Sequence, residues 1–416
     1  MDPGAAGHRI AQISRAMTSA SEAGASKQVS ALDGGGRGVA AALVRRAGEG
    51  GRGAGRNPLW RACCSFTRVD DGAQVRWGIV GSGLICSDFV QALRSAKGCA
   101  VTAVGARRIE SARKFADGNG IKLAFGSYDE LFACSEVDIV YIGTIHPTHK
   151  KLAIMAMRAG KHVLCEKPMT ICKADTAELF AVAEECGVLL VEALWTRFFP
   201  AVKKAREIIA SGAIGEVLQF QGDFGFRFDG VDSDPTHRLT DPAQAGGASL
   251  DIGVYPISCM LLALGTETPS KIAAAGTLTP SVRLAPPSLH MRSFALAAPI
   301  ALKGLIPCLW QGVDKAVGVT IVTGGKMASI TYTIEAQTPE EWRILGSNGM
   351  IVFPGPAHAP LSMVVTIAGA SRLDPPKTET ITLDPPVLIP EANKLNFPGS
   401  EGFLYQAQAL VRCHCP

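Results

Sequence analysis

The sequence predicts an α/β protein of two domains: a doubly wound parallel sheet, followed by an α+β domain with an open, mostly antiparallel sheet. Three observations support this prediction. From about Val75, short apolar strands alternate with helical segments, an order typical of a parallel sheet covered on both faces. After about Phe199, strands follow one another through tight turns instead. At 416 residues, the chain is long enough for both domains.

The first domain is expected over residues 75–197. Its first strand, VRWGIV, leads directly into apolar residues at helical spacing, and the later strands are followed by similar helical patterns. Glycines close some of these helices, because glycine readily adopts the left-handed conformation of a helix end. The predicted strands are 75–80, 100–106, 137–144, 162–167 and 188–194, and the predicted helices are 81–96, 109–118, 149–160 and 173–187.

The second domain is expected over residues 198–416. It opens with a helix, and the pair Gly324-Gly325 between two apolar runs predicts a hairpin. A cleft between the two domains is the expected ligand site. The predicted helix is 200–212, and the predicted strand segments are 216–228, 317–336, 342–353, 363–369 and 379–385.

Composition argues against several classes of protein. A hydrophobic content of 47% with 19% charged residues is ordinary for a soluble globular protein. The net charge of +4 is not gathered into a basic stripe, so no nucleic-acid partner is expected. No uninterrupted apolar stretch of about 18 residues occurs, so no membrane span is expected either. The 12 cysteines include no CxxC pair, and we expect free thiols in a reducing compartment with no metal site.

Residues 1–74 differ from the rest of the chain. They are rich in Gly, Ala, Ser and Arg, so they cannot bury enough surface to offset chain entropy, and we expect a disordered leader. It is an unstructured tail, a mistranslated upstream region or an organelle transit peptide, although its acidic residues are unusual for the last. The protein is expected in the cytoplasm, or in a mitochondrion or plastid if the leader is a transit peptide. The acidic residues are Asp2, Glu22, Asp33 and Glu49.

A glycine-rich turn, GSGLIC, joins the first strand to the first helix. Gly81 permits the tight turn, and Gly83 lets the backbone at Leu84 and Ile85 approach a pyrophosphate at the helix N-terminus. Cys86 is a small residue at the position where a third glycine usually stands. Because the motif follows a strand and opens a helix, it predicts a dinucleotide-binding Rossmann domain more strongly than a plain tight turn.

The end of the second strand bears on the choice of cofactor. An Asp or Glu there would bind the ribose 2′-hydroxyl group of NAD, whereas this chain has Ala106-Arg107-Arg108. Two cations suit the additional 2′-phosphate of NADP, and we favour NADP as the cofactor. The alternative is that both arginines are merely solvated.

Two further sequence patterns contain candidate catalytic residues. In GKHVLCEKPMT, Lys167 stands directly after an apolar strand and before Pro168, so it belongs either to a solvated loop or to the inside of a cleft. In LDIGVY, Asp251 and Tyr255 stand four residues apart, which puts both on one helix face. By spacing alone, these two could also be a helix cap and a packed core aromatic residue.

Several blocks of sequence resemble one enzyme family, that of glucose–fructose oxidoreductase and inositol dehydrogenase. Within it, the chain is most similar to the dimeric dihydrodiol dehydrogenases, which also act as NADP-dependent D-xylose 1-dehydrogenases. The resemblance implies an NADP-dependent oxidoreductase that acts on a sugar or cyclic diol and forms a homodimer. The alternatives are a keto-sugar reductase and a non-catalytic NADP-binding protein. The blocks, within residues 76–408, are GIVGSGLICSDF, SYDELF, VYIGTIHPTHK, AGKHVLCEKP, EALWTRFFP and AGGASLDIGVY.

The resemblance also implies roles for individual residues. Lys167 would lie beside the nicotinamide and the substrate hydroxyl group, where a cation stabilises a developing alkoxide. Tyr255 would be the general acid/base, and Asp251 would orient or charge the site. Near the substrate we expect Trp195 and Phe198, which could also be core aromatic residues, and, with its role open, Arg197. Near the cofactor we expect Thr144, Glu166 and His146, the last of which could equally be a loop residue or a helix cap.

Two segments depart from the family's pattern. Residues 281–312 interrupt adjacent sheet strands with proline-containing breaks and no strand period, and a long structureless loop is unusual inside a compact domain. We expect a translated intron or another gene-model error, which sequencing of the transcript would test. The chain then ends in VRCHCP soon after GFLYQAQAL, so we expect a late helix that is cut short.

Overall fold

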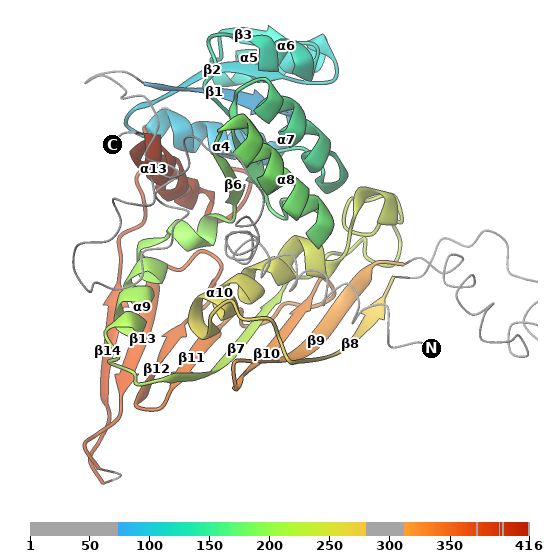
Figure 1. Cartoon of the computed structure of the whole chain (residues 1–416). Coiled ribbons are helices and arrows are strands. Elements are labelled where there is room, and N and C mark those ends of the chain that lie inside the picture. Colours follow the sequence, from blue (N-terminus) through green and yellow to red (C-terminus); the bar gives the residue numbers. More distant parts are fainter. Residues whose placement is uncertain (1–73, 280–311, 372, 391, 393–394, 415–416) are drawn as a thin grey trace, which may run out of the picture.

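The computed structural model describes residues 74–279, 312–371, 373–390, 392 and 395–414. Two sheets organise this part of the chain (Figure 1). The predicted leader and the predicted insertion lie outside the described residues, apart from Gln74 and Gly312.

The first domain is a parallel sheet with helices on both faces, as predicted. Its elements are β1 (Val75–Val80), α4 (Leu84–Ser95), β2 (Cys99–Gly105), α5 (Ile109–Asn119), β3 (Leu123–Phe125), α6 (Tyr128–Ala133), β4 (Ile139–Ile142), α7 (His149–Arg158), β5 (His162–Glu166), α8 (Lys173–Cys186) and β6 (Leu190–Ala193). The strand order is β3-β2-β1-β4-β5-β6. Core residues of α4 and α5 pack on one face, and those of α6, α7 and α8 pack on the other. The sequence does not predict β3 or α6, because elements this short show no clear hydrophobic periodicity.

The second domain is an eight-stranded sheet, mostly antiparallel, as predicted. Its elements are α9 (Pro200–Ala210), β7 (Val217–Gly225), α10 (Val254–Leu264), β8 (Lys271–Leu278), β9 (Asp314–Thr323), β10 (Lys326–Thr333), β11 (Trp342–Gly346), β12 (Gly349–Phe353), β13 (Ser362–Ile367) and β14 (Lys377–Thr382). The order is β14-β13-β12-β11-β7-β10-β9-β8, and only β7 and β10 pair in parallel. Helix α10 lies across one face of this sheet (Figure 1).

Helix α10 is very apolar. In the described part of the chain, the stretch Pro242–Leu264 is long and apolar enough to cross a membrane, but 89% of its apolar window is buried inside the protein. This degree of burial is typical of a core helix between a sheet and a second layer.

The predicted hairpin forms between β9 and β10. Thr323 pairs with Lys326, so Gly324 and Gly325 alone make the turn. Their φ angles are 53° and 75°, and a two-residue turn with both central φ angles positive requires residues such as glycine.

The strands on either side of the predicted insertion pair directly. Leu278 of β8 pairs with Asp314 of β9, and the Thr279 N–H donates to the Val313 carbonyl oxygen at 2.8 Å. The chain therefore leaves and re-enters the sheet at one point.

The C-terminal part of the chain returns to the first domain. The predicted late helix forms α13 (Phe403–His414), whose Phe403 ring packs 5.7 Å from that of Phe89 in α4. The fully buried carboxylate of Asp88 accepts hydrogen bonds of 2.6–3.0 Å from Asn396 N, Asn396 Nδ2 and Phe397 N. A charge-assisted contact thus joins α4 to a segment more than 300 residues later.

Candidate active site

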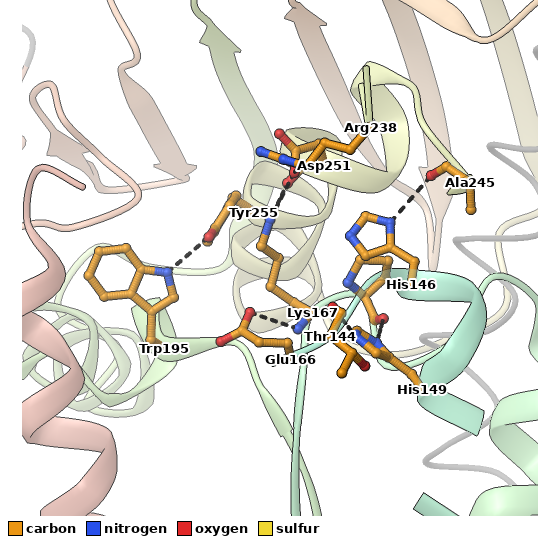
Figure 2. A network of polar contacts seen from close by, with 11 residues as sticks. Thr144, His146, His149, Glu166, Lys167, Trp195, Arg238, Ala245, Asp251 and Tyr255 are labelled. Atoms are coloured by element: carbon orange, nitrogen blue, oxygen red, sulfur yellow. Dashed lines mark hydrogen bonds and ion pairs between the residues drawn. The ribbon is translucent and has the colours of Figure 1, made fainter. Parts of the chain in front are cut away.

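Lys167 lies at the carboxyl end of β5, where the first sheet meets the helical layer of the second domain (Figure 2). Its Nζ donates to the backbone oxygen of Asp251 at 2.6 Å and lies 3.4 Å from Asp251 Oδ1. The side chain is only 14% exposed. Lys167 is therefore a cation held between the two domains and not part of a solvated loop.

Asp251 lies between two cations. It belongs to a π-helical turn, η6 (Ser249–Gly253), and its Oδ1 also accepts a hydrogen bond of 2.9 Å from Arg238 Nη1. Burial alone would raise the pKa of Asp251, but the charges of Lys167 and Arg238 outweigh burial and hold this pKa below its usual range. Burial lowers the pKa of Lys167, but the neighbouring groups, among which Asp251 has the largest effect, raise this pKa above its usual value. Both groups are therefore charged at neutral pH.

Tyr255 is in the first turn of α10 and contacts the same cation. Its ring centroid lies 5.1 Å from Lys167 Nζ, and its hydroxyl oxygen accepts a hydrogen bond of 2.9 Å from Trp195 Nε1. Burial raises the pKa of Tyr255, and the opposing charge of Lys167 does not cancel this effect. The phenol is thus neutral at neutral pH. The predicted shared helix face of Asp251 and Tyr255 spans a π-helical turn and the start of α10, and both residues contact Lys167.

The WTRF segment forms a 3-10 helix, η4 (Trp195–Phe198), beside Tyr255. Trp195 is 5% exposed and packs against the rings of Phe199 and Phe403. Its indole therefore positions the Tyr255 hydroxyl group, a contact that the predicted pocket-lining role does not include. Phe198 is half-buried and Arg197 is exposed.

The glycine turn leaves space at the N-terminus of α4. Gly81 has a φ of 110°, in the left-handed region that favours glycine. A Cβ atom on Gly83, the N-cap residue, would meet no atom within 4 Å, and no side chain caps the helix. Leu84 is 61% exposed beside this space. The first N–H groups of α4 are therefore available to an anion such as a pyrophosphate.

Cys86 and Ile85 face the interior from the same turn of α4. Cys86 is fully buried, with Sγ 3.4 Å from the Gly143 carbonyl oxygen, and Ile85 packs against the core. A Cβ atom on Gly143 would collide with Cys86 Sγ. A cysteine fits at the third position of the motif because the facing residue, Gly143, has no side chain.

Arg107 and Arg108 follow the end of β2, and both are exposed. They lie close to the glycine turn, because the Gly81 N–H donates to the Gly105 carbonyl oxygen at 2.9 Å. Two exposed cations next to a dinucleotide turn are suited to bind a phosphate group.

The remaining predicted cofactor residues surround the carboxyl ends of β4 and β5. His149 is fully buried, with one ring nitrogen 3.0 Å from the Thr144 carbonyl oxygen and the other 3.0 Å from that of Pro168. His146 Nδ1 lies 3.3 Å from the Ala245 carbonyl oxygen, and burial lowers the pKa of His146 to about 3. His146 thus connects this edge of the first domain to the loop before Asp251.

The Glu166 carboxyl group faces the interior. It accepts hydrogen bonds from Tyr141 Oη at 2.7 Å and from the Lys167 N–H at 3.1 Å. Burial raises the pKa of Glu166 to about 7. In this arrangement, Glu166 fixes the backbone from which the Lys167 side chain extends.

Sequence reasoning missed Arg238, Gly143 and the indole contact of Trp195. Arg238 lies in a loop without periodicity, and no local pattern connects it to Asp251. Gly143 lies inside the predicted strand 137–144, but only the packing of Cys86 shows why a glycine is needed there.

Comparison with known proteins gives two family matches. Residues 75–193 match the oxidoreductase family with an NAD-binding Rossmann fold, and residues 202–352 match the GFO/IDH/MocA C-terminal domain. Trans-1,2-dihydrobenzene-1,2-diol dehydrogenase from Sus scrofa is 36% identical over 344 residues, which are 82% of this chain and 88% of that protein. The enzyme of the same name from Danio rerio is 34% identical over 342 residues, with the same coverage.

Solved structures share the fold. A 3-ketoreductase from Actinomadura kijaniata, in complex with NADP and TDP-benzene, has a TM-score of 0.60 at 25% identity over 82% of this chain and 91% of that one. Levoglucosan dehydrogenase, in complex with NADH and levoglucosan, has a TM-score of 0.65 at 21% identity, with the same coverage. From the two domain matches and the curated relatives, the chain belongs to the GFO/IDH/MocA family of oxidoreductases and has an NAD(P)-binding Rossmann domain.

Proposed function

We propose that the protein is an NADP-dependent dehydrogenase that oxidises a carbinol carbon of a sugar or cyclic diol. The observation that supports this most directly is the position of Lys167, held by Asp251 against the ring of Tyr255 where the two domains meet. The names of the curated relatives support a cyclic diol as one substrate class. A screen of the purified protein against aldoses and diols, with NAD and with NADP, tests the proposal.

The glycine turn and the open N-terminus of α4 fit a dinucleotide, whose nicotinamide supplies the hydride acceptor when bound. The side chains of the protein transfer the substrate proton and stabilise the negative charge. The phenolate form of Tyr255 takes the hydroxyl proton of the substrate as the carbonyl group forms, and Lys167 stabilises this phenolate and the negative charge that develops on the substrate oxygen. Asp251 keeps Lys167 charged and directed at this point, while Trp195 fixes the Tyr255 hydroxyl oxygen.

The reverse reaction, reduction of a keto-sugar, is the second candidate. The raised pKa of Tyr255 favours it, because a neutral phenol at neutral pH is ready to donate a proton. Comparing initial rates of NADPH oxidation with keto-sugars and of NADP reduction with sugars would separate the two directions. A non-catalytic NADP-binding protein would show neither rate.

The choice of NADP rests on Arg107 and Arg108. Replacing both by alanine should raise the KM for NADP by about tenfold to a hundredfold, because hydrogen bonds to a charged phosphate are lost. The KM for NAD should stay within about twofold, since NAD lacks the 2′-phosphate. Steady-state kinetics with each cofactor measures both values, with Arg158→Ala on α7 as the control. Equal losses for NAD and NADP would contradict the proposed role.

We also propose that two copies pair through the second sheet, on the face opposite α10. One row of paired residues on that face runs through Val322, Met327, Gln219, Leu345 and Met350. Met327 and Met350 are 41% and 36% exposed, and these five residues carry no charge, whereas the next residue of the row, Lys271 on the edge strand β8, does. Such a surface is suited to burial against a second copy.

Light scattering should therefore give the mass of a dimer for the wild-type protein. The double variant Met327→Lys/Met350→Lys should give the mass of a monomer, because like charges would face one another in the interface. A monomeric wild-type protein would contradict the proposed dimer.

A further inference from the structure

We infer that His358 is a substrate-binding residue, whose imidazole Nε2 accepts a hydrogen bond from a hydroxyl group other than the one oxidised. The inference rests on the proposed function and narrows its substrate class to compounds that carry a second hydroxyl group, as a pyranose or a vicinal cyclic diol does. None of the sequence patterns points to this residue.

His358 belongs to the same aromatic cluster as Tyr255. Its ring stacks on Phe224 with centroids 4.9 Å apart and planes inclined by 16°. The ring centroids of Tyr255 and Trp195 each lie 5.6 Å from that of His358. The imidazole ring is thus a direct neighbour of the Tyr255 ring, whose phenolic oxygen would take the substrate proton.

Glu340 fixes the orientation of the imidazole. One carboxylate oxygen, Oε1, receives both the backbone N–H of His358, at 3.2 Å, and the ring Nδ1 in a short contact. A carboxylate oxygen accepts, so Nδ1 donates, and in the neutral tautomer of an imidazole with Nδ1–H the other nitrogen, Nε2, has a lone pair. Within the described chain, Nε2 has no hydrogen-bond partner, and the side chain is 16% exposed. One ring nitrogen is therefore anchored and the other remains available.

The backbone around this pair is also held in place. Glu340 has a φ of 56°, a conformation uncommon for a residue other than glycine and persistent only where the surroundings fix it. Its N–H donates to Asp223 Oδ2 at 2.7 Å, and its carbonyl oxygen accepts from the Ala357 N–H at 3.1 Å. Thr196 Oγ1 donates to the His358 carbonyl oxygen, which links the pair to the helix that carries Trp195.

These contacts favour a polar ligand. An acceptor fixed near Tyr255 favours a substrate that brings a second hydroxyl group, because this group replaces the hydrogen bond of Nε2 to water. A pyranose and a vicinal cyclic diol both carry such a group. The pair of Glu340 and His358 thus favours either of them over a substrate with a single hydroxyl group.

Two variants test the assignment. His358→Phe keeps the stacking on Phe224 and removes the acceptor, whereas His358→Gln restores a polar group of similar reach. For D-xylose with NADP, we expect His358→Phe to lower kcat/KM by about tenfold to a hundredfold, mainly through KM, and His358→Gln to recover part of this loss. Calorimetric binding of 1,5-anhydroxylitol, which lacks the C1 hydroxyl group, to the NADP-loaded protein should weaken by a similar factor in His358→Phe. NADP affinity should be unchanged, whereas the melting temperature should fall in His358→Phe, because Glu340 Oε1 loses its ring donor and keeps only the backbone N–H of residue 358.

The outcomes distinguish the two proposals. If His358→Phe binds 1,5-anhydroxylitol and turns over D-xylose as the wild type does, the assignment of His358 is wrong and the proposed reaction stands. If the wild type binds 1,5-anhydroxylitol, loses that affinity in His358→Phe and yet oxidises neither a sugar nor a cyclic diol, the assignment stands and the proposed reaction is wrong. A wild type that binds no polyol overturns the assignment.

Discussion

Replacing Lys167 by alanine is expected to abolish measurable turnover, a loss of at least about a thousandfold in kcat, while NADP affinity changes little. The ammonium group lies against the Tyr255 ring and contacts Asp251, so its removal takes away the only cation that touches both groups among the described residues. The cofactor would still find the glycine turn and the N-terminus of α4 intact. Initial rates from NADPH absorbance and a calorimetric titration with NADP measure the two effects.

The matched control is Lys204→Ala, because Lys204 is a lysine on α9 that pairs only with Glu207 on the surface. It should keep wild-type kinetics. Lys167→Met is a useful second variant, since it keeps the bulk of the side chain and separates loss of charge from loss of packing. Near-normal turnover in Lys167→Ala would refute the catalytic role.

Tyr255→Phe is expected to lower kcat by about a hundredfold to ten-thousandfold, because it removes the group that takes the substrate proton and keeps the ring. The pH dependence provides a second readout. Since burial raises the pKa of Tyr255, the phenolate fraction grows as pH rises from neutral, so the rate of sugar oxidation should rise with it. Carbonyl reduction, which needs the protonated phenol, should fall as pH rises through the same pKa.

Profiles of kcat/KM against pH in both directions test this expectation, with Tyr405→Phe as the control. The Tyr405 ring packs on Phe199, as a phenylalanine ring also would, and its hydroxyl group donates to the Asp384 carbonyl oxygen and not to a group at Tyr255. The residual activity of Tyr255→Phe should lose the alkaline rise. If the rise persists in that variant, another group accepts the proton.

Much of the fold follows from local patterns. The apolar strands from Val75 to Ala193 and the Gly324-Gly325 turn appear in the structure close to their predicted positions. Strand β8 escapes prediction, because it is an exposed edge strand whose small residues show no clear alternation of buried and exposed positions. A local sequence pattern predicts an element where burial imposes a hydrophobic periodicity, and it fails to predict one where burial does not.

Some residues of the candidate site could likewise be predicted from the sequence, and others could not. Lys167, Asp251 and Tyr255 stand in recognisable blocks, so the sequence could bring them together although Lys167 and Asp251 are 84 residues apart. Arg238 and His358 stand in irregular loops, and their partners are reached only through the tertiary fold. Without a motif or a period, no property of the sequence near these residues indicates what they contact.

The buried carboxylate of Asp88 has a consequence for shortened forms of this protein. Its hydrogen-bond donors come from Asn396 and Phe397. In a chain truncated before these residues, the Asp88 carboxylate on α4, the helix that begins at the glycine turn, would lose all of these donors. Leaving a buried acceptor without its donors typically costs about 1–3 kcal/mol, and more when the acceptor is charged. An isolated N-terminal half would therefore be a poor substitute for the intact molecule in nucleotide-binding studies, even though it contains the whole parallel sheet.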